Sequence, residues 1–304
     1  MLPSVPYSIN WNFTDMCSFN CRHCYSRGRP AKQEMSDDDY VKIAEKISNS
    51  GVFYVNFGGG EPILARRALE LCTRILSEKG VSTFVSTTGW KLTEELLLSL
   101  KDKGLKGFFF SIDSLNSDIH DYIRNQKGCL EKTKLALKMA VDNKMFTGLS
   151  TVVSKFNWKE IPQILDFAVA SGCNAVSLKR FRPVGNGLKN DKDFSLEGEK
   201  ESEMLALMKF VKEKYSSKLD LSFVYRDFPI QGFAEGCPCG VKSLGLMPNG
   251  DVKMCVYGFK VIGNLLKDDL SDIWLNDPYL KQNRIHHVCE GMNDERRSNK
   301  NEDK

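Results

Sequence analysis

Residues 8–25 read SINWNFTDMCSFNCRHCY, a short apolar run that leads directly into three closely spaced cysteines. The run Ser8–Phe13 is rich in residues that favour β-strands. Similar runs predict further strands at Phe53–Phe57, Thr83–Ser86, Gly107–Ile112, Gly148–Val153 and Ala175–Lys179. The three cysteines therefore stand immediately after the first predicted strand.

Between the predicted strands lie stretches with apolar residues at helical spacing. The first begins at Ser36, a predicted N-cap with Asp39 in the capping-box position. Other helices are predicted near Leu64–Glu78, Thr93–Lys103, Gly128–Asn143 and Trp158–Ser171. This alternation predicts an α/β fold, a TIM-like (β/α) barrel or partial barrel with parallel strands, whose chemistry lies at the C-terminal ends of the strands.

The alternation of strands and helices ends after a long charged helix predicted near Leu196–Lys214. Leu246–Tyr257 predicts a β-hairpin around Asn249-Gly250, a dipeptide suited to a type I′ turn, and Leu270–Ile285 predicts a short helix. We therefore expect a barrel over residues 1–214, a small C-terminal domain over 215–292 and a disordered polar tail over 293–304.

Composition limits the classes of function. The chain has 304 residues, enough for a large core, and its net charge of +4 is too mild to predict a nucleic-acid partner. No signal segment opens the chain and no apolar stretch is long enough to cross a bilayer, so we expect a cytoplasmic protein with no membrane partner. In a reducing compartment its ten cysteines indicate packing, metal ligation or catalysis rather than disulfides.

Cys17, Cys21 and Cys24 form the pattern C-x-x-x-C-x-x-C. Three thiolates on a short loop can hold three irons of a [4Fe-4S] cluster and leave the fourth iron open for a ligand. The alternative is a zinc site with His23 as fourth ligand, but structural zinc usually pairs two C-x-x-C segments. The spacing therefore favours an iron-sulfur cluster. Cysteines without ligand spacing are expected in the core: Cys72, Cys129 and Cys173.

With Tyr25 in the aromatic position after the third cysteine, this loop resembles that of the radical S-adenosylmethionine (radical SAM) superfamily. The resemblance implies that the amino and carboxylate groups of S-adenosylmethionine (SAM) chelate the open iron. It also implies that an electron from the reduced cluster splits SAM into methionine and a 5′-deoxyadenosyl radical, which takes a hydrogen atom from the substrate. A flavodoxin or ferredoxin would supply that electron.

Gly59, Gly60, Glu61 and Pro62, after the second predicted strand, resemble the family's G-G-E-P motif. The resemblance implies that bare backbone and the Glu61 carboxylate accept hydrogen bonds from the ammonium of SAM. A tight strand-to-helix turn is the alternative explanation for the same glycines. A phosphate loop is disfavoured, because no Gly-Lys-Ser/Thr follows.

Later strand ends add weaker resemblances. Ser86–Gly89 resembles the third-strand T-N-G segment, and the run Lys179–Gly187 resembles an R-x-x-P-x-G exit that would form a backbone wall beside the adenosine, with an ordinary loop start as the alternative. Ser111 and Arg124 match the S-x-D and H-D-x-x-R stretches, which implies that they hold the SAM carboxylate. Arg124 is alternatively an ordinary charge on a helix surface. The cofactor-binding residues so implied are Tyr25, Gly59, Gly60, Glu61, Pro62, Ser111 and Arg124.

A second set of cysteines follows in the C-terminal part, namely Cys237, Cys239, Cys255 and Cys289. Together with Gly263–Leu265 and Ile273-Trp274, it resembles the SPASM/twitch extension, which carries auxiliary iron-sulfur clusters. The full SPASM pattern has more cysteines, and Met292 stands where another is expected, so one auxiliary cluster, a [4Fe-4S] cube, is the limit. Cys289 either completes that cluster or is spare. A zinc knuckle with His286 or His287 is the alternative.

The resemblance implies a radical SAM oxidoreductase or maturase that abstracts hydrogen from a peptide or protein, and the auxiliary-cluster domain favours this hypothesis. Because Cys17 comes so early, we expect no N-terminal peptide-recognition domain before the barrel. We therefore expect a peptide to dock on the barrel itself or to arrive with a separate adaptor protein. The motifs assign cofactor-binding roles and leave catalytic residues within the substrate site unknown.

Two other hypotheses remain. A small-molecule enzyme acting on a sugar, a tetrapyrrole or a metal-pterin precursor requires a closed pocket, whereas a peptide enzyme requires an open groove. A non-catalytic iron or zinc protein that binds a partner predicts no cleavage of SAM, and the intact cysteine triplet together with Gly59–Pro62 argues against it.

Overall fold

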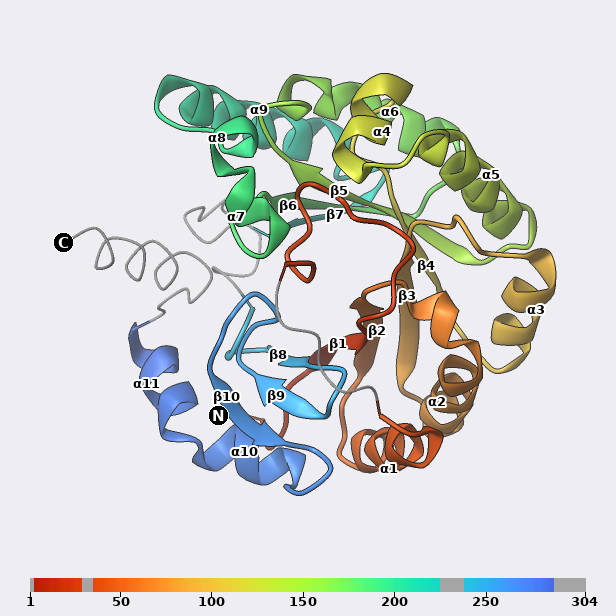
Figure 1. Ribbon diagram of the computed structural model, residues 1–304, viewed down its shortest axis with the longest axis vertical. Helices are drawn as coiled ribbons and strands as arrows, with labels where there is room; N and C mark the ends of the chain where they lie inside the picture. Colours follow the sequence, from red (N-terminus) through yellow and green to blue (C-terminus); the bar gives the residue numbers. More distant parts are fainter. Residues whose placement is uncertain (1–2, 29–34, 225–237, 287–304) are drawn as a thin grey trace.

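A single curved sheet with helices on its outer side dominates the computed structural model, which describes residues 3–28, 35–224 and 238–286 (Figure 1). The strand order in the sheet is β10-β9-β8-β1-β2-β3-β4-β5-β6-β7. Because the sheet curves without closing, the molecule is an open partial barrel, and the predicted α/β class is confirmed. No helix in these three ranges is long and apolar enough to span a membrane.

Seven parallel strands, β1 to β7, form the barrel part of the sheet in the described ranges, and they include the six barrel strands that the sequence predicts. The strands are β1 (Ser8–Thr14), β2 (Tyr54–Gly59), β3 (Ser82–Thr87), β4 (Gly107–Ser111), β5 (Phe146–Val153), β6 (Ala175–Arg180) and β7 (Asp220–Val224). The main helices between them are α1 (Asp37–Ser48), α2 (Arg66–Glu78), α3 (Glu94–Asp102), α4 (Ser117–Arg124), α5 (Cys129–Asp142), α6 (Ile161–Ala170) and α9 (Glu199–Tyr215). Shorter helical segments are η1 (Pro62–Ala65), η2 (Trp158–Glu160), α7 (Asn186–Lys189) and α8 (Asp191–Phe194).

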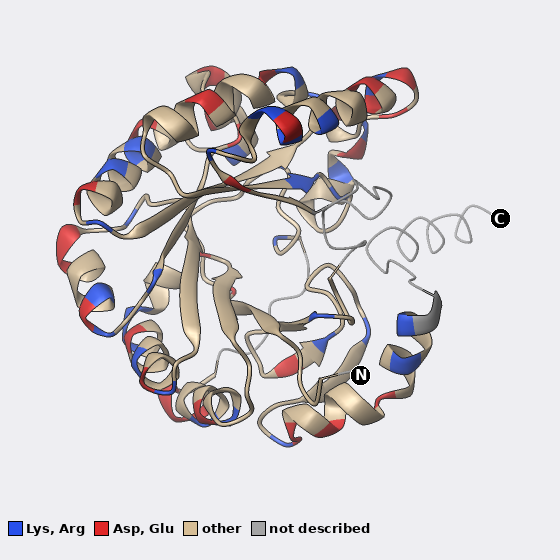
Figure 2. Cartoon of the chain, turned by 180° about the vertical axis from the view of Figure 1, so that it is seen from behind, with Lys and Arg blue, Asp and Glu red and all other residues tan. Residues whose placement is uncertain are grey.

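The core lies between the outer face of the sheet and the helices. Alternation along β1 sends Trp11 and Phe13 to this side, where their rings contact Tyr40 of α1 and Phe57 of β2. Ser36 caps α1, and the predicted capping box with Asp39 is present. Most of the charged residues belong to the outer helices (Figure 2). The inner face of the sheet is thereby left for the site.

The C-terminal part extends the same sheet. It comprises β8 (Ser243–Leu246), β9 (Asp251–Lys253), β10 (Val261–Asn264), α10 (Leu270–Asn276) and α11 (Pro278–His286). Strand β8 pairs in parallel with β1, whereas β9 and β10 continue antiparallel. Strand β7 lies beyond residue 214 and pairs with β6, so the parallel sheet passes the boundary expected from sequence. The division into domains stays a prediction.

The hairpin after β8 does not use the expected type I′ turn. Gly250 donates its N–H to the Met247 carbonyl at 3.0 Å and has φ of +81°, but Asn249 is not in the left-handed region. A type I′ turn needs positive φ at both central residues, and Pro248, the first of them here, is held near −65° by its ring. The proline therefore excludes the expected turn.

The predicted helix Leu270–Ile285 is divided into α10 and α11 by Asp277. Pro278 starts the second helix, a position where the missing N–H of proline costs nothing, and it disfavours helical backbone at the residue before it. The apolar periodicity runs through this break, which is why it suggested one helix.

Candidate active site

One cavity of about 440 Å³ lies inside the curve of the sheet, at the C-terminal ends of the strands. Both cysteine sets reach it, because its lining includes Cys17, Cys21, Cys24, Cys239 and Cys255. Two other predicted ligands, Cys237 and Cys289, lie outside the described residues, as do His287 and the side chain of His286. The structure thus brings together residues that are more than 200 positions apart in the chain.

The loop with Cys17, Cys21 and Cys24 is held on one side by the end of β2. Gly60 donates its N–H to the Thr14 carbonyl and Glu61 to the Met16 carbonyl, both at 2.7 Å. A Cβ atom on Gly60 would lie 2.2 Å from the Met16 oxygen, so only glycine permits this approach. The motif therefore also positions the cysteine loop.

The exit of β6 supports the other side of the same loop. Asn186 donates its N–H to the Cys24 carbonyl at 2.9 Å and its side-chain amide to the Cys21 carbonyl at 3.1 Å. Gly185 has φ of +62°, and a Cβ there would lie 2.6 Å from the Tyr25 oxygen. The segment that resembles R-x-x-P-x-G thus supports the cysteine loop through hydrogen bonds. Its contact with adenosine stays a prediction.

The sulfurs of this loop fit a cluster chemically. The backbone N–H of Phe19 donates to Cys17 Sγ at 3.4 Å, and that of Arg27 donates to Cys24 Sγ at 3.3 Å. Burial raises the pKa of the Cys21 thiol to about 12 and also raises that of Cys17. Neutral pH alone therefore leaves these thiols protonated, and a bound metal supplies the charge that stabilises thiolates. Soft sulfur donors with backbone N–H support fit an iron-sulfur cluster.

His23 is engaged by Asp113, whose Oδ2 lies 3.0 Å from its Nε2. Burial lowers the pKa of His23. Within the described ranges, no three His, Cys, Asp or Glu side chains converge as ligands of a single metal ion.

Arg124 forms an ion pair with Asp113, with 2.7 Å between Nε and Oδ2, and both side chains are buried. This charge lowers the pKa of Asp113 and, with burial, lowers that of His120 to about 4. The alternative that Arg124 is a helix-surface charge is wrong, because only 7% of the residue is exposed. Arg124 also lines the cavity, and its role toward the SAM carboxylate stays a prediction.

Glu61 is buried and already accepts hydrogen bonds. Its donors are the hydroxyl groups of Thr87 and Thr88, each at 2.6 Å, and the Thr88 N–H at 2.9 Å. Burial nevertheless raises the pKa of Glu61. The third-strand segment therefore orients the glutamate of the second-strand motif, a role that the sequence did not reveal because it depends on strand neighbours.

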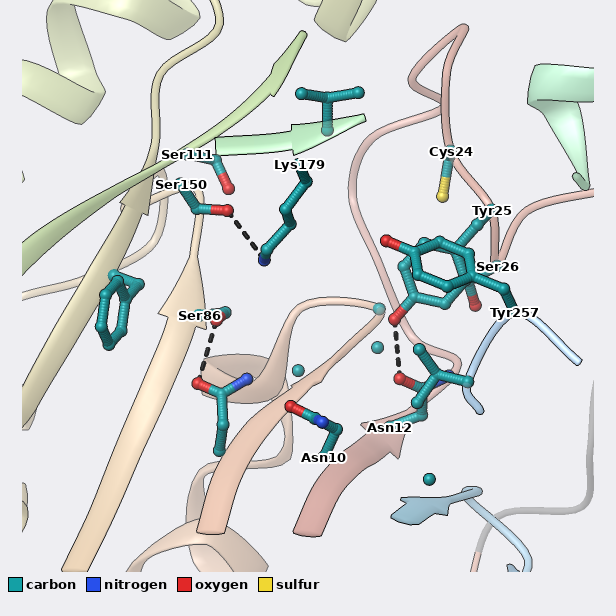
Figure 3. A pocket seen from close by; sticks show the side chains of 18 of the residues that line it. Asn10, Asn12, Cys24, Tyr25, Ser26, Ser86, Ser111, Ser150, Lys179 and Tyr257 are labelled. Atoms are coloured by element: carbon teal, nitrogen blue, oxygen red, sulfur yellow. Dashed lines mark hydrogen bonds between the residues drawn. The ribbon is translucent and has the colours of Figure 1, made fainter. Parts of the chain in front are cut away.

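Two aromatic rings connect the cysteine sets. The ring of Tyr25 lies 4.7 Å from that of Tyr257, and Tyr25 donates its hydroxyl to Asn12 Oδ1 at 2.7 Å (Figure 3). Tyr257 donates its backbone N–H to Cys255 Sγ at 3.5 Å. The loop after β1 and the hairpin that carries Cys255 thus meet through this pair.

Sequence reasoning missed the polar inner wall of the barrel. Serine and asparagine side chains from β1 to β7 line the cavity, together with Lys179 of β6. Lys179 donates to Ser150 Oγ at 3.0 Å, and burial together with Arg124 lowers the pKa of Lys179 to about 8. Period-two alternation of Ser and Asn with apolar residues was the available signal.

The open α/β barrel with a C-x-x-x-C-x-x-C loop after β1 and G-G-E-P after β2 defines a class of iron-sulfur enzymes. The family model of the radical SAM superfamily matches residues 11–168, and the chain belongs to that superfamily. A second model, an iron-sulfur cluster-binding (SPASM) domain, matches residues 237–300. Members carry a [4Fe-4S] cluster with SAM, and the SPASM domain adds an auxiliary iron-sulfur cluster.

Similar proteins differ in what they act on. AdoMet-dependent heme synthase of Methanosarcina barkeri is 24% identical, over 90% of this chain and 84% of that protein. PqqA peptide cyclase of Rhizobium meliloti is 25% identical, over 90% of this chain and 75% of that protein. SuiB of Streptococcus suis bound to SAM has a TM-score of 0.78 at 18% identity, over 93% and 68% of the two chains. The last likeness concerns the fold alone.

Proposed function

We propose that the chain uses a SAM-derived 5′-deoxyadenosyl radical to abstract a hydrogen atom from a peptide or protein, as a maturase-type oxidoreductase. The observation that carries this proposal is the shared cavity, because Cys17, Cys21 and Cys24 line the same space as Cys239 and Cys255. A substrate held there contacts both cluster sites. When bound, the first cluster supplies the electron that cleaves SAM.

We assign the following roles to the chain's own residues. Cys17, Cys21 and Cys24 hold the first cluster, whereas Cys237, Cys239 and Cys255 hold the auxiliary cluster, which Cys289 either completes or leaves with an open iron. SAM lies against Tyr25, Gly59, Gly60, Glu61, Pro62, Ser111 and Arg124. Glu61 is oriented for this by Thr87 and Thr88, whose hydrogen bonds keep the carboxylate fixed before the cofactor arrives.

Peptide relatives support the choice of substrate. PqqA peptide cyclase is similar over 90% of this chain, and SuiB has been solved bound to its precursor peptide SuiA. The similar identity of a heme synthase, 24%, favours a small-molecule substrate as the second candidate. In either case we propose a cytoplasmic enzyme reduced by a flavodoxin or ferredoxin, and for a peptide a separate adaptor protein remains part of the proposal.

Cleavage of SAM tests the first half of the proposal. The anaerobically reconstituted, dithionite-reduced protein is expected to form 5′-deoxyadenosine, and Cys17→Ala is expected to abolish it because the cluster loses a ligand. Cys173→Ala, a cysteine outside the cavity, is the matched control and should retain the activity. Formation of 5′-deoxyadenosine by Cys17→Ala at the wild-type rate would refute the assignment.

The substrate class is tested with extracts of perdeuterated cells of the source organism. Transfer of deuterium into 5′-deoxyadenosine, followed by mass spectrometry, reports hydrogen abstraction from a true substrate. Proteinase treatment of the extract is expected to remove the transfer if the substrate is a peptide. Transfer that survives proteinase and passes a small-molecule filter would replace the peptide proposal with the second candidate.

A further inference from the structure

Serines form a row across the inner wall of the sheet. Ser111 of β4 pairs with Ser150 of β5, Ser150 with Ser177 of β6, and Ser177 with Ser222 of β7. All four line the cavity. Bulky branched side chains fill this space in an ordinary (β/α) barrel, so a row of hydroxyl groups here indicates a polar ligand.

A lysine stands beside this row. Arginines also line the cavity, but Arg124 is paired with Asp113 and Arg180 with Glu201. Lys179 lies two residues after Ser177 on the same strand, which places both side chains on one face of the sheet. Figure 3 shows its side chain reaching into the cavity toward Ser150, whose Oγ accepts from Nζ at 3.0 Å. In the part of the chain that the structure describes, Lys179 has no ion-pair partner.

The carboxylates near Lys179 are already engaged by other groups. Asp113, at the end of β4, is already bonded to Arg124 and His23, and Arg124 of α4 repels the ammonium. Glu61 is bonded to two threonines. Burial and repulsion accordingly lower the pKa of Lys179 to about 8. A desolvated cation with spare N–H donors is stabilised when an anionic ligand completes the site.

We propose that Lys179, together with Ser150 and Ser177, binds a carboxylate group of the substrate inside the barrel. This inference rests on the proposed function, since it names the chemical class of a substrate group at the same site. A carboxylate carries one negative charge, which a single ammonium balances, whereas a phosphate monoester with a charge of about −1.5 to −2 is left partly uncompensated. Serine hydroxyls donate to its remaining lone pairs.

In a peptide, the carboxylate belongs to an Asp or Glu side chain or to the C-terminus. SAM is the other source of a carboxylate in this cavity, and our assignment gives that group to Ser111 and Arg124. The experiments therefore separate substrate from cofactor.

The first experiment measures binding at the residue itself. The lysines of the anaerobic, cluster-loaded protein are briefly labelled by reductive methylation at pH 8. Labelling is carried out in the presence of propionate, propionamide or SAM, and the methylation of each lysine is quantified by mass spectrometry. Propionate near twice its dissociation constant is expected to reduce labelling of Lys179 about threefold, while the neutral propionamide leaves it unchanged. Exposed Lys91 is the internal control. Protection by SAM but not by propionate would overturn the proposal.

The second experiment uses the deuterium-transfer assay with the stimulating extract fraction. Lys179→Met is expected to raise the concentration of the extract fraction that gives half-maximal deuterium transfer by about tenfold, because a charge-assisted hydrogen bond to the substrate is lost. The half-saturating SAM concentration should shift far less. Lys179→Arg should restore part of the binding, and Lys91→Met is the matched control. Iron content and thermal unfolding verify that each variant is folded.

Chemical modification of the fraction completes the design. Amidation of its carboxyl groups is expected to abolish deuterium transfer by the wild-type protein. If the wild-type protein forms no 5′-deoxyadenosine, the proposed function fails and the carboxylate subsite with it. If transfer proceeds normally with Lys179→Met or with the amidated fraction, the subsite alone fails. If Lys179→Met mainly raises the half-saturating SAM concentration, Lys179 belongs to the cofactor site.

Discussion

At the residue scale, Asp113 connects several parts of the site. Its carboxylate contacts the His23 ring of the cysteine loop and forms an ion pair with Arg124 of α4. It also accepts a hydrogen bond from the Val152 N–H of β5. His120 accepts the Asp113 backbone N–H at 3.2 Å. The loop that carries the proposed cluster ligands is thus tied to the sheet through one buried negative charge.

Removal of that charge should be costly. Asp113→Asn leaves the buried Arg124 guanidinium without a counter-ion, and we expect the free energy of unfolding to fall by about 3–5 kcal/mol. Chemical denaturation of the anaerobic protein measures it. Asp142→Asn, which breaks an exposed ion pair with Lys138, is the control and should change stability little. An equal effect of both substitutions would contradict the role assigned to Asp113.

The charge of Lys179 should make substrate binding depend on pH. With its pKa lowered to about 8, Lys179 is protonated below that pH and loses its charge as the pH rises through it. Binding of a carboxylate needs the charged form, so the apparent kcat/KM for the substrate fraction should fall between about pH 7 and 9. Lys179→Arg stays charged, and its profile should be flat over this range. A parallel fall in both proteins would assign the titration to another group.

At the element scale, the end of β2 and the loop after β1 form one unit. Gly59 and Gly60 let the two backbones touch, and two hydrogen bonds of 2.7 Å join them. The third strand adds the hydroxyl groups that orient Glu61. The geometry of the cysteine loop is therefore set by neighbouring strand ends and not by the loop alone.

Gly60→Ala should disturb this unit. The added Cβ would meet the Met16 oxygen at 2.2 Å, so the cysteine loop must shift, and we expect a loss of about 1–3 kcal/mol of stability. Iron content after reconstitution should fall as well. Gly58→Ala is the matched control, because its Cβ finds only an ordinary contact at 3.7 Å. Full iron content in Gly60→Ala would show that the loop tolerates the displacement.

At the scale of the whole molecule, the C-terminal part supplies a wall of the cavity. Strand β8 pairs with β1 in register from Ser8 and Ser243 onward, which brings the hairpin with Cys255 beside the cysteine loop. Trp274 of α10 donates to the Pro3 carbonyl at 2.9 Å and further fixes this part against the start of the chain. One continuous sheet thus places both sets of proposed cluster ligands around one space.

Iron analysis tests this arrangement. Two full clusters predict about eight irons per chain, and Cys255→Ala is expected to lower the content toward about four, because only the auxiliary cluster loses a ligand. Electron paramagnetic resonance of the reduced protein should retain the signal that SAM perturbs. A Cys255→Ala protein that keeps all its iron and forms full product would refute an auxiliary cluster held by this residue.

Features that depend on local spacing were predictable from the amino-acid sequence alone. Strand and helix periods predicted the alternation, and three cysteines after the first strand predicted a cluster loop, because these signals lie within a few consecutive residues. The G-G-E-P resemblance identified glycines whose close backbone approach the structure then explained.

Contacts between groups that are distant in the chain could be learned from the folded molecule and not from local patterns. The ion pair of Arg124 with Asp113, the threonine partners of Glu61 and the inward position of Lys179 depend on which strands are neighbours and which face is concave. The pairing of β8 with β1 depends on the path of the entire chain. The local periodicity of apolar residues predicts that a segment is a strand, but long-range packing determines which strands lie beside it. The role of a charged side chain depends on those neighbouring strands.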